Sequence, residues 1–204
     1  LNEATYQYIR NQVPFIVGVD TAHTDIDNIG YDHYEVATKA VQYLIDKGHT
    51  RIGFIGGNGL NANIRGSLRY KGYYSAMHAA GLTVNPDWVI NCQWDEGLCI
   101  EGVDKLCKLK DRPTAIFAAS DLMAMAALSS LYLNGVNVPS EMSVIGLSNI
   151  DLSKYSNPPL TTLEIPTKEM GLVAVDLLLS RINGDNLLPK KVIIPTTLIL
   201  RSST

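Results

Sequence analysis

The stretch "TAIFAASDLMAMAALSSLYLNG", from Thr114 to Gly135, contains the unit from which the whole fold is predicted. Residues 114–119 form a short apolar run of the kind found in strands that are buried on both faces. Residues 121–134 have a helical pattern that stops at Gly135, a common residue just past a helix end. The stretch therefore predicts a strand that passes directly into a helix, as in a parallel sheet.

The same alternation of apolar runs and helical patterns continues along the chain. Strands are expected at residues 13–20, 51–57, 88–94, 114–119, 143–148 and 191–200. Helices are expected at residues 34–47, 66–80, 97–109, 121–134 and 167–183. This order predicts the α/β class, with doubly wound parallel sheets.

Composition excludes several classes of protein. The 204 residues carry a formal net charge of −3 without a cluster of Lys or Arg, so this chain has no electrostatic footprint for nucleic acid. No apolar run is long enough for a membrane span, and the N-terminus does not resemble a signal peptide. Three cysteines without close pairing favour a reducing, cytoplasmic compartment. The four scattered histidines suggest no metal site, and no cofactor is expected.

Ligands of parallel α/β sheets bind beyond the carboxyl ends of the strands, so the residues at those ends are the candidate site. The "GNGLNA" stretch (57–62) resembles a dinucleotide fingerprint, but the acidic residue expected after the next strand is missing. "GLSNI" (146–150) resembles a nucleophile elbow, but all four histidines precede its serine, and an enzyme is not expected. A pocket for a small polar ligand remains, with the candidates Asp20, Arg65, Arg69, Trp94, Ser120, Asp121, Ser148 and Asn149.

Several of these residues also have an ordinary structural interpretation. Asp121 is expected to be the N-cap of the following helix, which makes Ser120 the better ligand candidate. Trp94 could instead be packed in the core, and Arg69 could form a surface salt bridge. The residue pattern leaves these alternatives for Trp94 and Arg69 open.

Five segments in order resemble the effector-binding domain of LacI/GalR-family transcription repressors. They are "KGHTRIGFIGG" (47–57), "RYKGYYSAMHAAGL" (69–82), "RPTAIFAASDLMAMAAL" (112–128), "VPSEMSVIGLSNI" (138–150) and "PPLTTLEIPTKEMG" (158–171). The resemblance covers the chain from about Val13 to Ser202. It implies a two-lobed, periplasmic-binding-protein-like type I fold.

The resemblance also implies how the chain is divided between the two lobes. Residues 1–31 and 164–194 are expected to form an N-lobe that is only partly present, and residues 32–163 and 195–204 the C-lobe. The chain begins with Leu and is expected to be a piece of a longer protein. The DNA-binding helix-turn-helix is absent from it, so operator DNA would be reached only through that missing N-terminal domain.

Carried over residue by residue, the resemblance implies an effector site between the lobes. Ser148 stands where the family usually has an Asp that binds sugar hydroxyls. Because Arg65 and Arg69 are four residues apart on an expected helix, they are predicted to face the same way and to favour an acidic or phosphorylated sugar. The implied effector contacts are Arg69, Trp94, Ser120, Ser148, Asp20 and Tyr31, with Arg65 added.

The expected function is therefore allosteric control of a cytoplasmic transcription repressor by a sugar or sugar-derived effector. The alternative is an extracytoplasmic sugar-binding protein that serves a transporter. The helix at 121–134 is apolar on nearly every side, which predicts a second covering surface. A homodimer would provide it, with Met125, Leu128, Tyr132 and Tyr155 at the interface.

Overall fold

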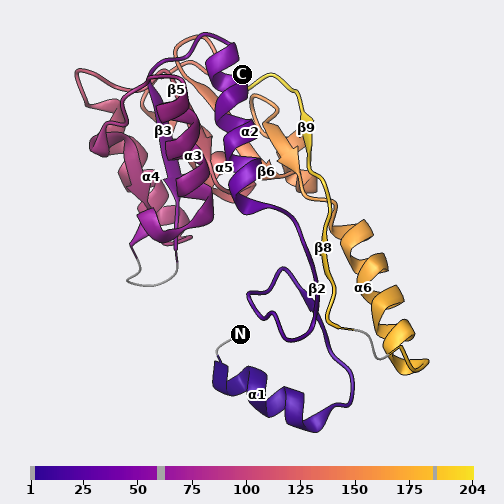
Figure 1. The fold of residues 1–204 in the computed structure, drawn as a ribbon. Helices are drawn as coiled ribbons and strands as arrows, with labels where there is room; N and C mark the ends of the chain where they lie inside the picture. The colour runs from indigo at the N-terminus through magenta and orange to yellow at the C-terminus, as the bar shows by residue number, and fades with distance from the viewer. Residues whose placement is uncertain (1–2, 59–62, 186–187) are drawn as a thin grey trace. The chain divides into compact units, whose positions relative to one another are not determined.

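The computed structural model describes residues 3–58, 63–185 and 188–204, and they form two compact units (Figure 1). The smaller unit consists of Leu1–Asp32 and Pro166–Pro195, and the larger one of His33–Ile165 and Thr196–Thr204. The chain thus passes between the units after residues 32, 165 and 195.

The larger unit is built on a six-stranded sheet in the order β4-β3-β5-β6-β7-β9. All neighbouring strands are parallel except the pair β7 and β9, which confirms the predicted fold class. The strands are β3 (Ile52–Gly56), β4 (Val89–Asn91), β5 (Ala115–Ala118), β6 (Ser143–Ser148), β7 (Thr161–Glu164) and β9 (Thr197–Ile199).

Helices cover both faces of this sheet (Figure 1). Helices α2 (His33–Asp46) and α3 (Leu68–Ala79) lie side by side on one face. Helices α4 (Glu96–Cys107) and α5 (Asp121–Leu133) pair on the other. Gly72 allows α2 and α3 to approach closely, because a Cβ there would lie 2.3 Å from the Tyr34 carbonyl oxygen.

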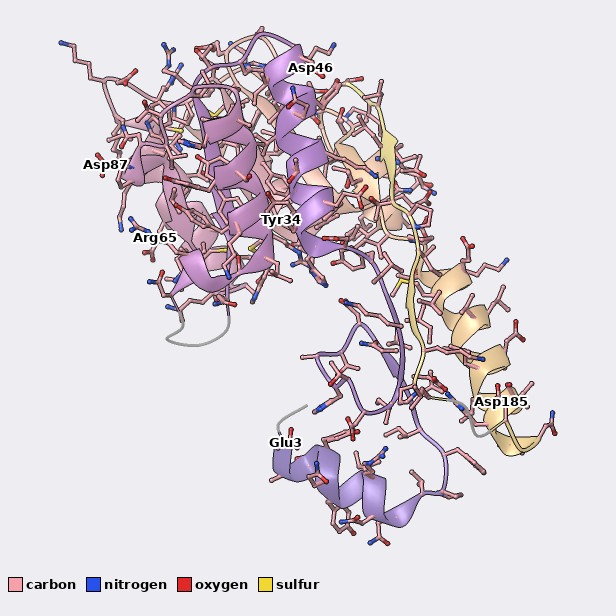
Figure 2. All side chains as sticks on the ribbon, viewed as in Figure 1. Glu3, Tyr34, Asp46, Arg65, Asp87 and Asp185 are labelled. Atoms are coloured by element: carbon pink, nitrogen blue, oxygen red, sulfur yellow. The ribbon has the colours of Figure 1, made fainter. Side chains whose placement is uncertain are left out.

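The smaller unit contains a three-stranded parallel sheet in the order β1-β2-β8. Its elements are α1 (Glu3–Gln12), β1 (Val17–Val19), β2 (Asp27–Gly30), α6 (Thr167–Ile182) and β8 (Lys191–Ile193). The Arg181 side chain on α6 binds the buried Asp27 carboxylate through two hydrogen bonds of 2.7 and 2.8 Å. The Arg181 guanidinium also lies 3.7 Å from the carboxylate of Asp185, a residue that follows the end of α6 (Figure 2).

Some predicted element boundaries were wrong. The strand expected at 13–20 is shorter than predicted and consists of β1 alone. The strand expected at 88–94 is preceded by a 3₁₀ turn, η2 (Pro86–Trp88), because Asn85 caps a segment with Pro86 at its first position. The strand expected at 191–200 is two strands, which belong to different sheets. Helix α1 and strands β2 and β7 were not predicted. In the described part of the chain, no helix is both long and apolar enough to cross a membrane.

Candidate functional site

A pocket of about 330 Å³ opens at the carboxyl ends of β3 and β4. This is the edge at which a parallel α/β sheet normally binds its ligand. All of its described lining residues belong to the larger unit. They are His33, Gly57, Asn58, Gly66, Ser67, Leu68, Arg69 and Trp94.

Trp94 forms one wall of this pocket because the chain turns sharply after β4. Gln93 and Trp94 both have positive φ angles, of 52° and 66°. Residues other than glycine seldom adopt this conformation, and such strain is concentrated at binding sites. Trp94 is 37% exposed, so the alternative that it is a core residue was wrong.

Gly57 supports the same wall from β3. A Cβ at Gly57 would lie 3.0 Å from the Trp94 backbone nitrogen and 3.0 Å from the indole Cδ1. A side chain at this position would therefore displace Trp94. The glycine that resembles the start of a dinucleotide fingerprint thus serves to seat an aromatic ring, and residues 59–62 of that motif lie outside the described residues.

Arg69 reaches the pocket from the first turn of α3. Ser67 caps this helix by accepting a hydrogen bond of 3.1 Å from the Tyr70 backbone N–H. The Arg69 guanidinium carbon then lies 5.3 Å from the centroid of the Trp94 ring, in the range of a cation–π contact. Arg69 and Trp94 form a flat, positively charged wall, which suits a ring that carries hydrogen-bond acceptors.

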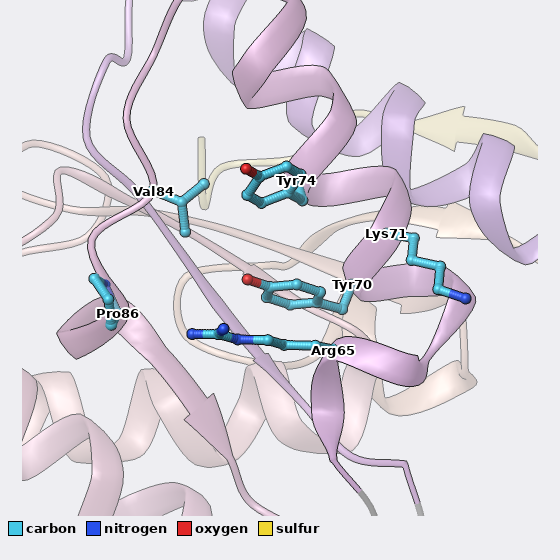
Figure 3. Close-up of a pocket in the computed structure, with 6 residues that line it drawn as sticks. All are labelled: Arg65, Tyr70, Lys71, Tyr74, Val84 and Pro86. Carbon is cyan, nitrogen blue, oxygen red and sulfur yellow. The ribbon is translucent and has the colours of Figure 1, made fainter.

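Arg65 does not line this pocket, and its predicted partnership with Arg69 was wrong. It belongs to a separate 3₁₀ turn, η1 (Ile64–Gly66), and α3 begins only at Leu68. Ser67 between them is extended, with φ −70° and ψ 141°, so the four-residue spacing of one continuous helix does not apply. Arg65 lines a different pocket, with Tyr70 and Tyr74 (Figure 3).

Ser120 takes the N-cap role that was predicted for Asp121, so that prediction was wrong. Ser120 is the N-cap of α5, because its side chain accepts a hydrogen bond of 3.3 Å from the Met123 N–H. Asp121 is the first helical residue and is 1% exposed. Its carboxylate accepts hydrogen bonds from the Ile150 N–H and the Thr162 hydroxyl. Burial raises the pKa of Asp121, while these two hydrogen bonds oppose the rise.

Ser148 ends β6 with a φ of 134°, and Asn149 follows at 55°. The Asn149 amide is already engaged, since its oxygen accepts from Arg201 at 2.6 Å and its nitrogen donates to Glu164 at 3.1 Å. Ser120 and Ser148 lie at the same sheet edge as the pocket, but neither is among its described lining residues.

Asp20 and Tyr31 belong to the smaller unit. They follow β1 and β2, at the carboxyl edge of the three-stranded sheet. Asp20 has a φ of 52° and is exposed, whereas Tyr31 is buried. Their predicted roles as effector contacts stay predictions. His33 and Asn58, which the sequence did not single out, line the pocket, and no local pattern marks either residue.

Of the four residues predicted at a dimer interface, Tyr132 and Tyr155 are 78% and 75% exposed. Met125 is half-buried. Leu128 is only 5% exposed and belongs to the core of its own chain, because this side of α5 faces the sheet and α4. A shallow groove of about 280 Å³ nevertheless runs beside these residues, lined by Met125, Leu128, Ser129, Tyr132, Ser156 and Asn157.

A parallel α/β unit with a polar pocket at the carboxyl ends of its strands defines a class of small-molecule-binding domain. Residues 41–204 match the family described as periplasmic binding protein-like domain. The chain belongs to this family, in the form found in LacI-type transcription regulators.

Its relatives are repressors and not enzymes. The HTH-type transcriptional repressor PurR of Aliivibrio salmonicida is 40% identical over 176 residues, which are 84% of this chain and 51% of that protein. PurR of Pasteurella multocida is 39% identical over 175 residues, again 84% of this chain and 51% of the relative. The chain thus spans about half the length of these relatives.

Solved structures show the same fold. A LacI-type regulator from Bacillus cereus subsp. cytotoxis superimposes with a TM-score of 0.87 at 28% identity, covering 100% of this chain and 73% of that one. The transcriptional regulator CelR in complex with cellobiose gives a TM-score of 0.84 at 25% identity, covering 99% and 69%.

Proposed function

We propose that this chain senses a small polar effector for a LacI-type repressor and that the pocket beside Arg69 and Trp94 receives it. The main support for this proposal is the contact between the Arg69 guanidinium and the Trp94 ring. It places a charged hydrogen-bond donor and a flat apolar surface at one pocket of ligand size. The repressor relatives favour this role over transport across a membrane. In a repressor, the domain acts inside the cell, where the DNA is.

The chemistry of the wall limits the effector to a ring-shaped polar molecule. A sugar ring or a planar heterocycle can stack on the wall while its hydroxyl, carbonyl or ring-nitrogen acceptors meet the guanidinium. The expected preference for an acidic or phosphorylated sugar depended on two arginines in one site and on the neutral Ser148 in place of the family's Asp. Because Arg65 lies elsewhere, a single cation faces this pocket from α3, and neutral ligands become the better candidates.

Effector binding would act on DNA through the rest of the repressor. A ligand shifts a conformational equilibrium only by its different affinity for the two states. Asp20 and Tyr31 of the smaller unit are proposed as further contacts, so that closure on the ligand changes the arrangement of the protein. The operator would be bound by a segment of the longer repressor outside these 204 residues.

A second copy of the chain is the proposed protein partner. Tyr132 and Leu133 on α5 lie exposed, and Leu152 and Tyr155 are exposed around the turn η3 (Asp151–Lys154). A cluster of large exposed apolar side chains of this kind marks an association surface. A twofold axis would bring the two α5 helices together, and such isologous contacts are the most common in soluble oligomers.

A thermal-shift screen of the 204-residue chain tests the effector proposal. The panel contains neutral sugars, sugar phosphates and purine bases, each at several concentrations. A ligand that binds only the folded chain, at a hundredfold excess over its Kd, stabilises it by about 2.7 kcal/mol. The stabilising compound is then titrated into an Arg69→Met variant. A compound that binds both proteins equally would contradict the assigned pocket.

A further inference from the structure

A second pocket, of about 380 Å³, lies on the other side of the start of α3 (Figure 3). Its volume falls in the range of small-molecule sites. The lining residues are Arg65, Tyr70, Lys71, Tyr74, Val84 and Pro86. They include two cations and two phenols but no carboxylate.

Three polar groups of this pocket point the same way. Figure 3 shows the Arg65 guanidinium and the hydroxyls of Tyr70 and Tyr74 directed toward the segment that carries Val84 and Pro86. The Lys71 ammonium points away from them in the same view. A guanidinium beside two hydroxyl donors is a suitable arrangement for a carboxylate or a phosphate.

Tyr70 places one of these hydroxyls on a ring that is fixed in the core. It is 7% exposed, and its ring packs edge-on against Phe54 in the core. Among residues 3–58, 63–185 and 188–204, its hydroxyl makes no hydrogen bond, and it is accessible at the pocket and not enclosed. A phenol hydroxyl in this position can donate a hydrogen bond to a ligand in the pocket without losing a partner within the chain.

The tyrosine rings also limit how a ligand can lie. Tyr74 is stacked between Tyr70 and His78, with centroid distances of 6.3 and 6.2 Å. A ligand therefore meets the hydroxyl edges of these rings instead of their faces. Its body is left to contact the aliphatic surfaces of Val84 and Pro86.

We propose that this pocket binds a small organic oxyanion, with its carboxylate or phosphate on Arg65, Tyr70 and Tyr74 and its apolar body on Val84 and Pro86. This site is separate from the proposed effector pocket. The two share only the short segment from η1 to the first turn of α3, from which Arg65 serves one and Arg69 the other.

Titration of the 204-residue chain with simple probes tests this site. Phenyl phosphate and benzoate combine a ring with an oxyanion, benzyl alcohol lacks the charge, and inorganic phosphate lacks the ring. We expect at least one of the two aromatic anions to bind, and to bind more tightly than benzyl alcohol or inorganic phosphate. In ¹⁵N–¹H NMR spectra, the shifted backbone amides should lie in residues 64–75 and 82–88.

Variants then identify the groups responsible. Arg65→Met should weaken binding of the aromatic anion at least about tenfold, the loss of one charge-assisted hydrogen bond. Tyr74→Phe removes only a hydroxyl from a half-exposed ring and should weaken binding without unfolding the chain. Arg51→Met removes a guanidinium elsewhere on the same unit, and Arg69→Met removes the one in the effector pocket, and both should leave the affinity unchanged.

Several results would overturn the proposal. Equal binding to the wild-type chain and to Arg65→Met would exclude the anion site. Loss of binding in Arg69→Met, with shifts at Gly57 and Trp94, would place the anion in the effector pocket. Failure of all four probes to bind would show that the pocket is not a binding site for organic oxyanions. If inorganic phosphate bound as tightly as the aromatic anions, Val84 and Pro86 would not contact the body of the ligand as proposed.

Discussion

The Thr162 hydroxyl donates a hydrogen bond of 2.5 Å to the Asp121 carboxylate, which joins strand β7 to the first turn of α5. The other carboxylate oxygen accepts the Ile150 N–H at 2.9 Å, just beyond β6. One buried side chain thus connects three segments at the carboxyl edge of the sheet. Asp121 therefore serves the fold of this edge and is not available to a ligand.

Replacing Asp121 with Ala should lower the free energy of unfolding by about 2–4 kcal/mol, because the buried Thr162 hydroxyl and the partly buried Ile150 N–H lose their acceptor. Ser120→Ala is the matched comparison and should cost about 1 kcal/mol, the usual effect of losing an N-cap. Urea unfolding followed by circular dichroism measures both. A larger loss of unfolding free energy for Ser120→Ala than for Asp121→Ala would contradict the roles assigned to these two residues.

Gly146→Ala should destabilise the chain by about 1–3 kcal/mol through overpacking. A Cβ at Gly146 would lie 2.3 Å from Asp121 Oδ1 and 2.9 Å from Leu160 Cδ2. In the Asp121→Ala background the first of these clashes disappears, so the cost of Gly146→Ala should fall. A double-mutant cycle measures this coupling, and strict additivity would refute the contact.

The buried pair of Asp27 and Arg181 should make the smaller unit sensitive to acid. The Arg181 guanidinium holds the pKa of Asp27 below its ordinary value. The ion pair therefore stabilises the folded chain fully at pH values above the pKa of Asp27 in the unfolded chain, about 3.9. This stabilisation is lost as the pH falls through the lower pKa of Asp27 in the folded chain.

Arg181→Met should cost about 3–5 kcal/mol at neutral pH, because it leaves a buried carboxylate unpaired. Lys39→Met is the control, since its exposed pair with Glu35 should contribute less than about 1 kcal/mol. Hydrogen exchange of residues 27–30 from pH 7 to pH 3 monitors the unit. Equal protection in Arg181→Met and Lys39→Met would contradict the assigned role.

Effector binding should depend on Arg69 and Trp94 and not on Ser120. Arg69→Met should weaken the binding free energy by about 1.5–3 kcal/mol through loss of a charge-assisted hydrogen bond. Trp94→Ala should weaken binding by removing the stacking face, whereas Ser120→Ala should change only stability. Calorimetric titration of the compound found in the screen separates these effects, and an unchanged Kd for Trp94→Ala would remove the proposed wall.

A Tyr132→Glu, Tyr155→Glu double variant should give a folded monomer on a sizing column with light scattering. Both side chains are largely exposed in one copy, so the change should not disturb the core. Tyr8→Glu, also at an exposed tyrosine, is the control and should leave the oligomeric state of the chain unchanged. A double variant that remains dimeric would place the interface elsewhere.

The sequence by itself determined the fold class, the order of most elements and the family. Runs such as residues 114–119 and the glycine at 135 act locally, so each strand–helix unit could be recognised without its neighbours. The strands β2 and β7 escaped prediction because their segments "DNIG" and "TTLE" contain few apolar residues. Their polar side chains are buried with partners that only the folded chain provides, as Asp27 is with Arg181 and Thr162 with Asp121.

The site was only partly accessible from the sequence. Arg69 and Trp94 were identified because each lies at the end or start of a predicted element, and the tertiary structure brings them together. The separation of Arg65 from Arg69 was decided by the extended backbone at Ser67, which interrupts a pattern that looks like one helix. The role of Asp121 was likewise decided by Thr162 and Ile150, which are distant in sequence and occupy its carboxylate, while Ser120 caps the helix. Local patterns determine which element forms, whereas a buried polar side chain takes its role from the partners that the fold brings to it.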